Sequence, residues 1–208
     1  MKKIVLNLSL VLATAFMLAS CNSKTAETAE GTTDSTAVEN VYTINSDASS
    51  KVEWKGDMLK MYSHNGTLAV KEGSLTTKGG AITAGTFTVD LTTITPTDSN
   101  YDNKDRTAAN LVGHLSSPDF FDVANNPTAT FVINSVNGNE ATGTLTIRGK
   151  SNEETLKNIV LTETDGTVTA TGTINFDRQK YGVAFKMTVK DMVLGDDIAL
   201  NIAITGKK

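Results

Sequence analysis

The sequence contains few of the residues that most often carry catalytic chemistry. Its 208 residues include one cysteine, two histidines and one tryptophan. Because Cys21 has no second cysteine to pair with, an intramolecular disulfide is excluded. No serine lies in the Gly-x-Ser-x-Gly context of a hydrolase nucleophile. These shortages argue against an enzyme that uses a thiol or serine nucleophile, and we predict no catalytic residue.

Long apolar runs are also absent, except for one near the start of the chain. Lys2 and Lys3 precede an apolar stretch, residues 4–16, that is too short to remain as a membrane-spanning helix. Small residues follow, so residues 1–20 have the pattern of a secretory signal peptide. The sequence Leu-Ala-Ser-Cys ending at Cys21 also resembles the bacterial lipobox. It predicts a lipoprotein that begins at Cys21 and carries diacylglycerol and acyl chains such as palmitate. The alternative is an ordinary signal peptide followed by a chance cysteine.

Residues 21–40 are mostly threonine, alanine, glutamate and serine, which cannot bury enough apolar surface to fold. They predict a disordered, lipidated tether. Removal of the signal peptide would leave 17 basic and 23 acidic residues, a net charge of −6, which makes nucleic acid an unfavourable partner. Asn22 stands where lipoproteins retained in the inner membrane often have aspartate. We therefore expect a lipid anchor in the outer membrane of the bacterial envelope, facing the periplasm.

Period-two alternation dominates residues 41–208, which have the length of one domain. In residues 168–176 apolar or small side chains alternate with threonines, and similar alternation recurs in residues 86–91, 144–147 and 198–204. This pattern predicts half-buried antiparallel strands. The turn sequences are Asn65-Gly66, Gly79-Gly80, Asn137-Gly138-Asn139, Arg148-Gly149 and Asp165-Gly166. Many short strands at hairpin spacing predict a sandwich or a barrel.

One segment, about residues 104–121, departs from this alternation. Its apolar side chains recur at helical spacing, at Ala108, Leu111, Val112 and Leu115. They predict one short helix. Ser117-Pro118-Asp119 then predicts the start of a second helical turn, which would carry Phe120 and Phe121. We expect this helical pair to plug one end of the sheet.

Four segments together carry a family resemblance. They are His114–Asp122, Asn126–Phe131, Gly143–Gly149 and Asn175–Val183, in this order along the chain. The ordered set resembles the signature of the YceI-like family, and the similarity extends from about Tyr42 to Thr205. The resemblance implies an all-β fold, an eight-stranded antiparallel lipocalin-like β-barrel, and some members of the family hold a polyisoprenoid chain inside it.

The small residues on the inward face bear on whether such a barrel is hollow. An eight-stranded barrel can be filled by side chains or can hold one narrow ligand. If Ile174 and Phe176 point inward, so do Ala170 and Gly172, which leave space for an apolar ligand. The alternative is that Gly172 marks a bulge in a solid barrel. The candidate ligand-binding residues are Trp54, Met58, Met61, Phe87, Val89, Phe131, Ile133, Leu145, Ile147, Ala170, Gly172, Ile174, Phe176, Val183, Phe185 and Met187.

Four polar residues are candidates for contact with the head group of a ligand at the barrel mouth: His64, Arg148, Arg178 and Tyr181. The alternative for the arginines is a surface ion pair with a nearby acid such as Asp177.

Part of a calcium-loop pattern precedes the predicted helix. Asp98, Asn100 and Asp102 have the required spacing, but Ala109 stands where the bidentate glutamate is needed. We therefore predict no metal site and expect an acidic, solvated loop.

The sequence thus predicts a lipid-anchored envelope protein, not an enzyme, that binds or carries a long apolar ligand. An isoprenoid or quinone-type lipid is the first expectation, and no cofactor is expected other than such a lipid or a fatty-acyl lipid. The expected partners are this ligand, the membrane and a second copy in a homodimer. The alternative is a non-catalytic stress or interaction lipoprotein with a solid barrel, which would act through loops such as residues 94–105.

Overall fold

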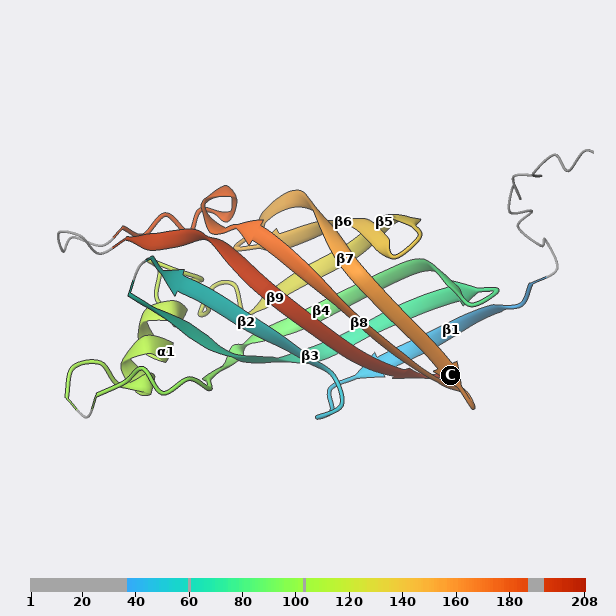
Figure 1. The fold of residues 1–208 in the computed structure, drawn as a ribbon, viewed down its shortest axis with the longest axis horizontal. Coiled ribbons are helices and arrows are strands. Elements are labelled where there is room, and N and C mark those ends of the chain that lie inside the picture. Colours follow the sequence, from blue (N-terminus) through green and yellow to red (C-terminus); the bar gives the residue numbers. More distant parts are fainter. Residues whose placement is uncertain (1–36, 60, 103, 187–192) are drawn as a thin grey trace, which may run out of the picture. The chain divides into compact units, whose positions relative to one another are not determined.

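The computed structural model describes residues 37–59, 61–102, 104–186 and 193–208. The predicted signal peptide, Cys21, most of the tether and Met187 lie outside the described residues. Within this part of the chain an antiparallel sheet closes on itself, and a short helix lies at one end of it (Figure 1). No helix in these ranges is long and apolar enough to cross a membrane.

The described strands follow one another along the chain with short connections. They are β1 (Glu39–Asn45), β2 (Lys51–Met58), β3 (Tyr62–Lys78), β4 (Ala81–Pro96), β5 (Thr128–Asn137), β6 (Glu140–Ile147), β7 (Lys150–Thr164), β8 (Thr167–Asp177) and β9 (Leu194–Lys207). The helix α1 (Ala108–Ser116) lies between β4 and β5, and the 3₁₀ turn η1 (Arg178–Tyr181) follows β8.

The order of neighbouring strands is β3-β2-β9-β8-β7-β6-β5-β4, and β4 pairs again with β3. This second pairing closes the barrel. β1 pairs with the part of β3 that β2 does not reach, and its Thr43 meets Lys207 of β9. β1 and β2 therefore share one strand position, and the described strands form eight positions in all. The predicted eight-stranded antiparallel barrel is confirmed.

The predicted alternation matches the observed burial. In β8 the side chains of Val168, Ala170 and Ile174 are buried, and those of Thr169 and Thr171 are exposed. Apolar residues thus face the barrel interior and threonines face outward, as the period-two pattern predicts.

Most of the predicted turns connect strands, and one does not. Arg148 and Gly149, for example, both have positive φ, 52° and 67°, as a two-residue hairpin turn of type I′ requires. Asn65-Gly66 was wrongly predicted as a turn, because Gly66 lies inside β3 opposite Trp54. The glycine is needed there for a close approach of the indole ring, and not for a reversal of the chain.

The helix is shorter than predicted. Thr107 caps its N-terminus by accepting a hydrogen bond from the Asn110 amide. Ser117 caps its C-terminus, because both its amide and its hydroxyl donate to the carbonyl of His114. Ser117 also starts the predicted short turn, because its carbonyl accepts from the amide of Phe120, and Pro118–Phe121 form turns instead of a second helix.

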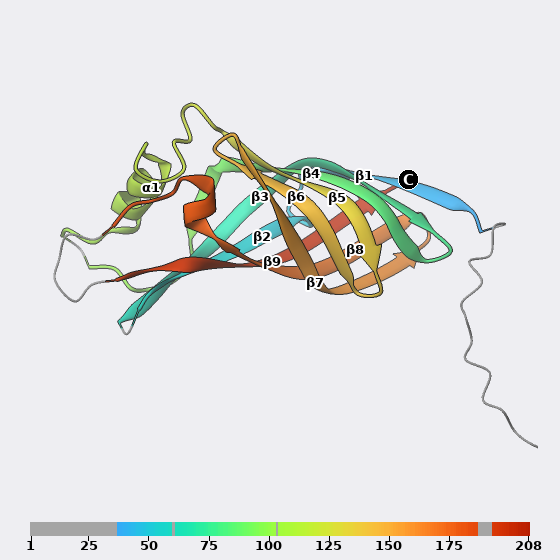
Figure 2. The same ribbon diagram turned by 90° about the horizontal axis from the view of Figure 1, so that it is seen from above.

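The two ends of the barrel differ. Figures 1 and 2 both show α1, η1 and the ends of β2 and β6 at one end, which we call the mouth, and the C-terminus at the other. The mouth comprises the described residues of 58–64, 97–121, 148–149 and 178–185. The far end is closed by side chains with almost no exposed surface, among them Tyr42, Ile44, Leu75, Thr77 and Val168.

Candidate ligand-binding cavity

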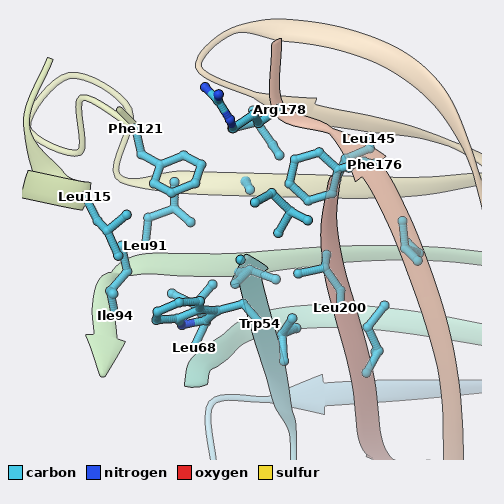
Figure 3. Close-up of a pocket in the computed structure, with 18 of the residues that line it drawn as sticks. Trp54, Leu68, Leu91, Ile94, Leu115, Phe121, Leu145, Phe176, Arg178 and Leu200 are labelled. Atoms are coloured by element: carbon cyan, nitrogen blue, oxygen red, sulfur yellow. The ribbon is translucent and has the colours of Figure 1, made fainter. Parts of the chain in front are cut away.

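A cavity of about 540 Å³ occupies the barrel interior. All eight strands from β2 to β9 contribute to its wall, which consists mainly of aliphatic and aromatic side chains. Figure 3 shows Trp54, Phe121 and Phe176 around it. The volume lies within the range of about 300 to 1,000 Å³ that is typical of small-molecule sites. The barrel is therefore hollow, and the solid interior of the alternative interpretation is not observed.

Most of the predicted ligand-binding residues line this cavity. They are Trp54, Met58, Phe87, Val89, Phe131, Ile133, Leu145, Ile147, Ala170, Gly172, Ile174, Phe176, Val183 and Phe185. The expectation for Met61 is corrected, because this residue is 56% exposed and does not line the cavity. It stands in the turn after β2, where the alternation has ended.

Sequence reasoning missed several lining residues, including Leu68, Leu91, Ile94, Leu115 and Leu200. The signal for Leu200 was present, because Ile198, Leu200, Ile202 and Ile204 alternate along β9. Leu115 comes from α1, and only the docking of the helix at the mouth brings it to the cavity. No periodicity in the strands indicates that position.

Large side chains lie against the barrel wall and leave the centre open. The ring of Phe87 lies over Gly73 and Gly85, where an added Cβ would be 2.9 Å from the nearest ring carbon in each case. The ring of Phe131 lies over Gly143 in the same way. Gly73 and Gly143 on the neighbouring strands, and Gly85 on β4 itself, thus make room for these rings against the wall.

Gly172 does not provide the open space that was predicted. Leu156 of β7 lies over it, and a Cβ at Gly172 would be 2.7 Å from Leu156 Cδ1. The pairing of β7 with β8 shifts opposite Gly172, between Lys157 and Val160. The cavity prediction was therefore right for a partly wrong reason, since this glycine accommodates a neighbouring side chain.

A polar cluster at the mouth is centred on Asp98, whose side chain is only 5% exposed. Its carboxylate accepts hydrogen bonds from the amides of Asn65 and Asn100, at 3.0 and 2.9 Å, and from the hydroxyl of Tyr101 at 2.7 Å. His64 Nδ1 lies 3.1 Å from its Oδ1 and 3.2 Å from its Oδ2. The prediction of an acidic, solvated loop is therefore wrong for Asp98, because four donors from two segments enclose it.

The electrostatics of this cluster favour the ionised carboxylate. Burial opposes ionisation of Asp98, but the hydrogen bonds from Asn100, Asn65, Tyr101 and His64 outweigh it and lower the pKa of Asp98 to about 2. Burial and the hydrogen bond to Asp98 raise the pKa of Tyr101. The imidazole of His64 is stacked on Tyr101, with ring centroids 5.1 Å apart, and contacts the edge of Tyr62 at the same distance. Tyr62, His64 and Tyr101 all line the cavity.

Arg178 lines the cavity, but each of its three guanidinium nitrogens already donates to the protein. The residue is 2% exposed, its guanidinium donates to the carbonyls of Gly195 and Val183, and it pairs with Asp196 at 2.8 Å. The alternative of an ion pair with a nearby acid thus holds for Arg178, but the acid is Asp196 and the arginine is buried, whereas Asp177 caps η1.

Arg148 and Tyr181 hold the mouth together and do not line the cavity. The guanidinium of Arg148 donates to the carbonyls of Phe120, Gly182 and Pro118. Tyr181 is fully buried, and its hydroxyl donates to Glu154 at 3.0 Å. Burial and the charge of Glu154 raise the pKa of Tyr181. Among the four candidate head-group residues, His64 and Arg178 therefore reach the cavity.

Of the residues of the incomplete calcium pattern, Asp102 is used within its own loop. Asp102 accepts hydrogen bonds from the amides of Lys104, Asp105 and Arg106, and these bonds hold its pKa well below the usual range. Within the described ranges, no group of three or more His, Cys, Asp or Glu side chains is arranged to hold a metal ion.

Comparisons with known proteins agree with this architecture. Two UPF0312 proteins, from Staphylococcus epidermidis and Staphylococcus aureus, are 34% and 35% identical over 116 residues, 51% of this chain and 64% of theirs. The chain thus spans less than two thirds of the length of these curated relatives. The crystal structure of BcnA from Burkholderia cenocepacia is 22% identical, with a TM-score of 0.57 over 77% of this chain and 99% of that one, which shows the shared fold. The model of the YceI-like domain matches residues 42–206, and the chain belongs to the YceI-like family.

Proposed function

We propose that this protein binds a long apolar ligand, an isoprenoid or quinone-type lipid, inside its barrel and carries or sequesters it in the bacterial envelope. The cavity of about 540 Å³ with its aliphatic and aromatic wall is the observation that supports this function. An empty apolar cavity of this kind loses dispersion contacts that an apolar guest restores. Each methylene removed from water contributes about 0.8 kcal/mol, so a chain of several prenyl units binds with little polar recognition.

The composition of the wall favours binding over covalent catalysis. No serine or cysteine occurs among the described residues that line the cavity. His64 has an acidic partner, but the nucleophile that a His-Asp pair would activate is not beside it in this lining. Membership of a family in which some members hold polyisoprenoid chains also supports a carrier rather than an enzyme.

The anchor is a separate part of the proposal and rests on the sequence before Cys21. We expect the bacterial host to incorporate labelled palmitate into the wild-type protein and to place it in the outer membrane, facing the periplasm. Cys21→Ala should remove both the label and the membrane association. Labelling that persists in Cys21→Ala would contradict lipidation at this residue.

The ligand is identified with the mature protein carrying Cys21→Ser, which prevents lipidation. This protein is first exposed to envelope lipids of the host. Native mass spectrometry followed by solvent extraction should reveal a stoichiometric prenyl or fatty-acyl species. The native mass also shows whether two chains associate, as the expected homodimer requires.

A cavity-filling variant provides the control. Ala170 is buried in β8 and lines the cavity, so Ala170→Phe should fold and carry much less lipid. Thr169→Phe adds the same ring to the exposed face of β8 and should carry as much lipid as the parent. A folded Ala170→Phe with full lipid content would contradict the cavity as the binding site. A parent protein that takes up no lipid would favour the interaction lipoprotein instead.

A further inference from the structure

We propose that His64 accepts a hydrogen bond from the head group of the cavity's ligand, and that this head group is an uncharged hydroxyl donor such as an alcohol, phenol or quinol. This inference rests on the proposed function, because it assigns the polar end of the ligand whose apolar chain occupies the barrel. At this nitrogen it disfavours two related head groups, a phosphate and a quinone carbonyl, and among quinone-type lipids it selects the reduced quinol.

The hydrogen bonds of Asp98 fix which nitrogen of His64 carries hydrogen. The carboxylate of Asp98 is ionised and only accepts, so His64 Nδ1, at 3.1 and 3.2 Å from its two oxygens, must be the donor. In the neutral imidazole Nε2 then has a lone pair and no hydrogen. When the imidazole is neutral, this nitrogen is therefore an acceptor, and a quinone carbonyl, which also only accepts, does not pair with it.

His64 Nε2 is open to a ligand. The described residues provide no hydrogen-bond partner for it, and it is not sealed inside the protein, because the buried side-chain atom without a partner in this part of the chain is Trp54 Nε1. The side chain of His64 is 21% exposed and lines the cavity. A hydroxyl at the mouth would meet this nitrogen while its chain extends into the barrel.

The imidazole is also held in place before any ligand arrives. Tyr101 stacks on one face of it with an interplanar angle of 13°, Tyr62 contacts it at 70°, and Asp98 fixes Nδ1. Little side-chain freedom remains to be lost on binding. The Tyr101 hydroxyl already donates to Asp98, so its hydrogen is not available to the head group.

The charges near the cavity disfavour an anionic head group. Asp98, Asp102 and Asp105 lie in the loop that follows β4. The two arginines that line the cavity are each paired, Arg106 with Asp102 at 3.1 Å and Arg178 with Asp196 at 2.8 Å. A phosphate would have to compete with the carboxylate that each arginine already binds, and of the three acids Asp105 lines the cavity.

Three probes with the same chain test the proposal: geranylgeraniol, its methyl ether and geranylgeranyl diphosphate. Trp54 is the only tryptophan and lines the cavity, so its fluorescence reports binding to the mature chain with Cys21→Ser at pH 8.5. One hydrogen bond predicts that the alcohol binds about threefold to tenfold more tightly than the ether. The diphosphate should bind more weakly than the alcohol.

Two histidine variants separate recognition of the head group from binding of the prenyl chain. His64→Phe keeps an aromatic ring on Tyr101 and removes both nitrogens, so the alcohol should lose its advantage while the ether binds as before. His114→Phe is the matched control, because His114 also lines the cavity but packs between Phe120 and Phe185. Equal affinities for alcohol and ether in the parent, or an advantage that survives His64→Phe, would overturn the proposal. Failure of all three probes to bind would overturn the proposed function with it.

Discussion

The indole ring of Trp54 lies over Gly66, its direct partner across the ladder between β2 and β3. A Cβ at Gly66 would lie 2.6 Å from Cζ2 of the indole, and the backbone oxygen of Thr95 would be closer still. The same relationship recurs where Phe87 and Phe131 cover glycines of neighbouring strands. These glycines allow the bulkiest inward side chains to lie along the wall, so the barrel keeps an open interior despite its aromatic residues.

This arrangement predicts a large effect for a small substitution. Gly66→Ala should destabilise the protein by about 1–3 kcal/mol, the usual cost of overpacking, because the Thr95 carbonyl belongs to the backbone and cannot move away. The new methyl group should also push the Trp54 ring into the cavity and reduce lipid uptake. Urea unfolding and lipid content measure the two effects.

Gly113→Ala is the control for this prediction. Gly113 lies in α1, and a Cβ there would meet nothing within 4 Å. Alanine is favoured over glycine in a helix by up to about 1 kcal/mol, so this variant should be as stable as the parent or slightly more stable. If Gly66→Ala matched Gly113→Ala in stability, the packing of Trp54 on Gly66 would not be the reason for the glycine.

Gly172→Ala should be tolerated better than Gly66→Ala. Its nearest neighbour would be Leu156 Cδ1 at 2.7 Å, the end of a flexible side chain, whereas the nearest backbone atom, the Lys157 oxygen, is 3.2 Å away. Leu156 lines the cavity and can turn toward it. We expect a smaller loss of stability together with a reduced cavity, measured by the same unfolding and lipid assays. A loss equal to that of Gly66→Ala would mean that Leu156 is held rigidly.

The strands were predictable because period-two alternation and hairpin turns act over a few residues, whereas the choice of an eight-stranded barrel over a sandwich came from the family resemblance. Val168, Ala170 and Ile174 reveal their shared face from spacing alone. The packing that shapes the cavity depends on pairs from different strands, such as Leu156 with Gly172, and spacing does not identify them. For the same reason His64 was recognised as a mouth residue, but its contact with Asp98, 34 residues away, was not.

The backbone conformation of Arg148 allows a substitution that tests whether its guanidinium stabilises the loops of the mouth. Its φ of 52° suits asparagine, so Arg148→Asn should preserve the turn and remove only the guanidinium that donates to Phe120, Gly182 and Pro118. We expect faster hydrogen exchange at the amides of Phe120 and Val183, with little change in the strands. Unchanged exchange there would show that the other contacts of the mouth suffice without Arg148.

The ionisation of Asp98 predicts how stability depends on pH. Because its folded pKa, about 2, lies below the ordinary value of about 3.9, its contribution is fully present above about pH 4 and is lost as the pH falls through 2. The contribution is on the order of 2 kcal/mol. The difference in unfolding free energy between the parent and Asp98→Asn should therefore shrink between pH 5 and pH 2. Tyr101→Phe removes one of the four donors to Asp98. In this variant the pH dependence of the unfolding free energy should be smaller than in the parent but still present. If the difference in unfolding free energy stayed constant with pH, the charge of Asp98 would not contribute to stability. The assignment of His64 Nδ1 as the donor, which depends on that charge, would then not hold.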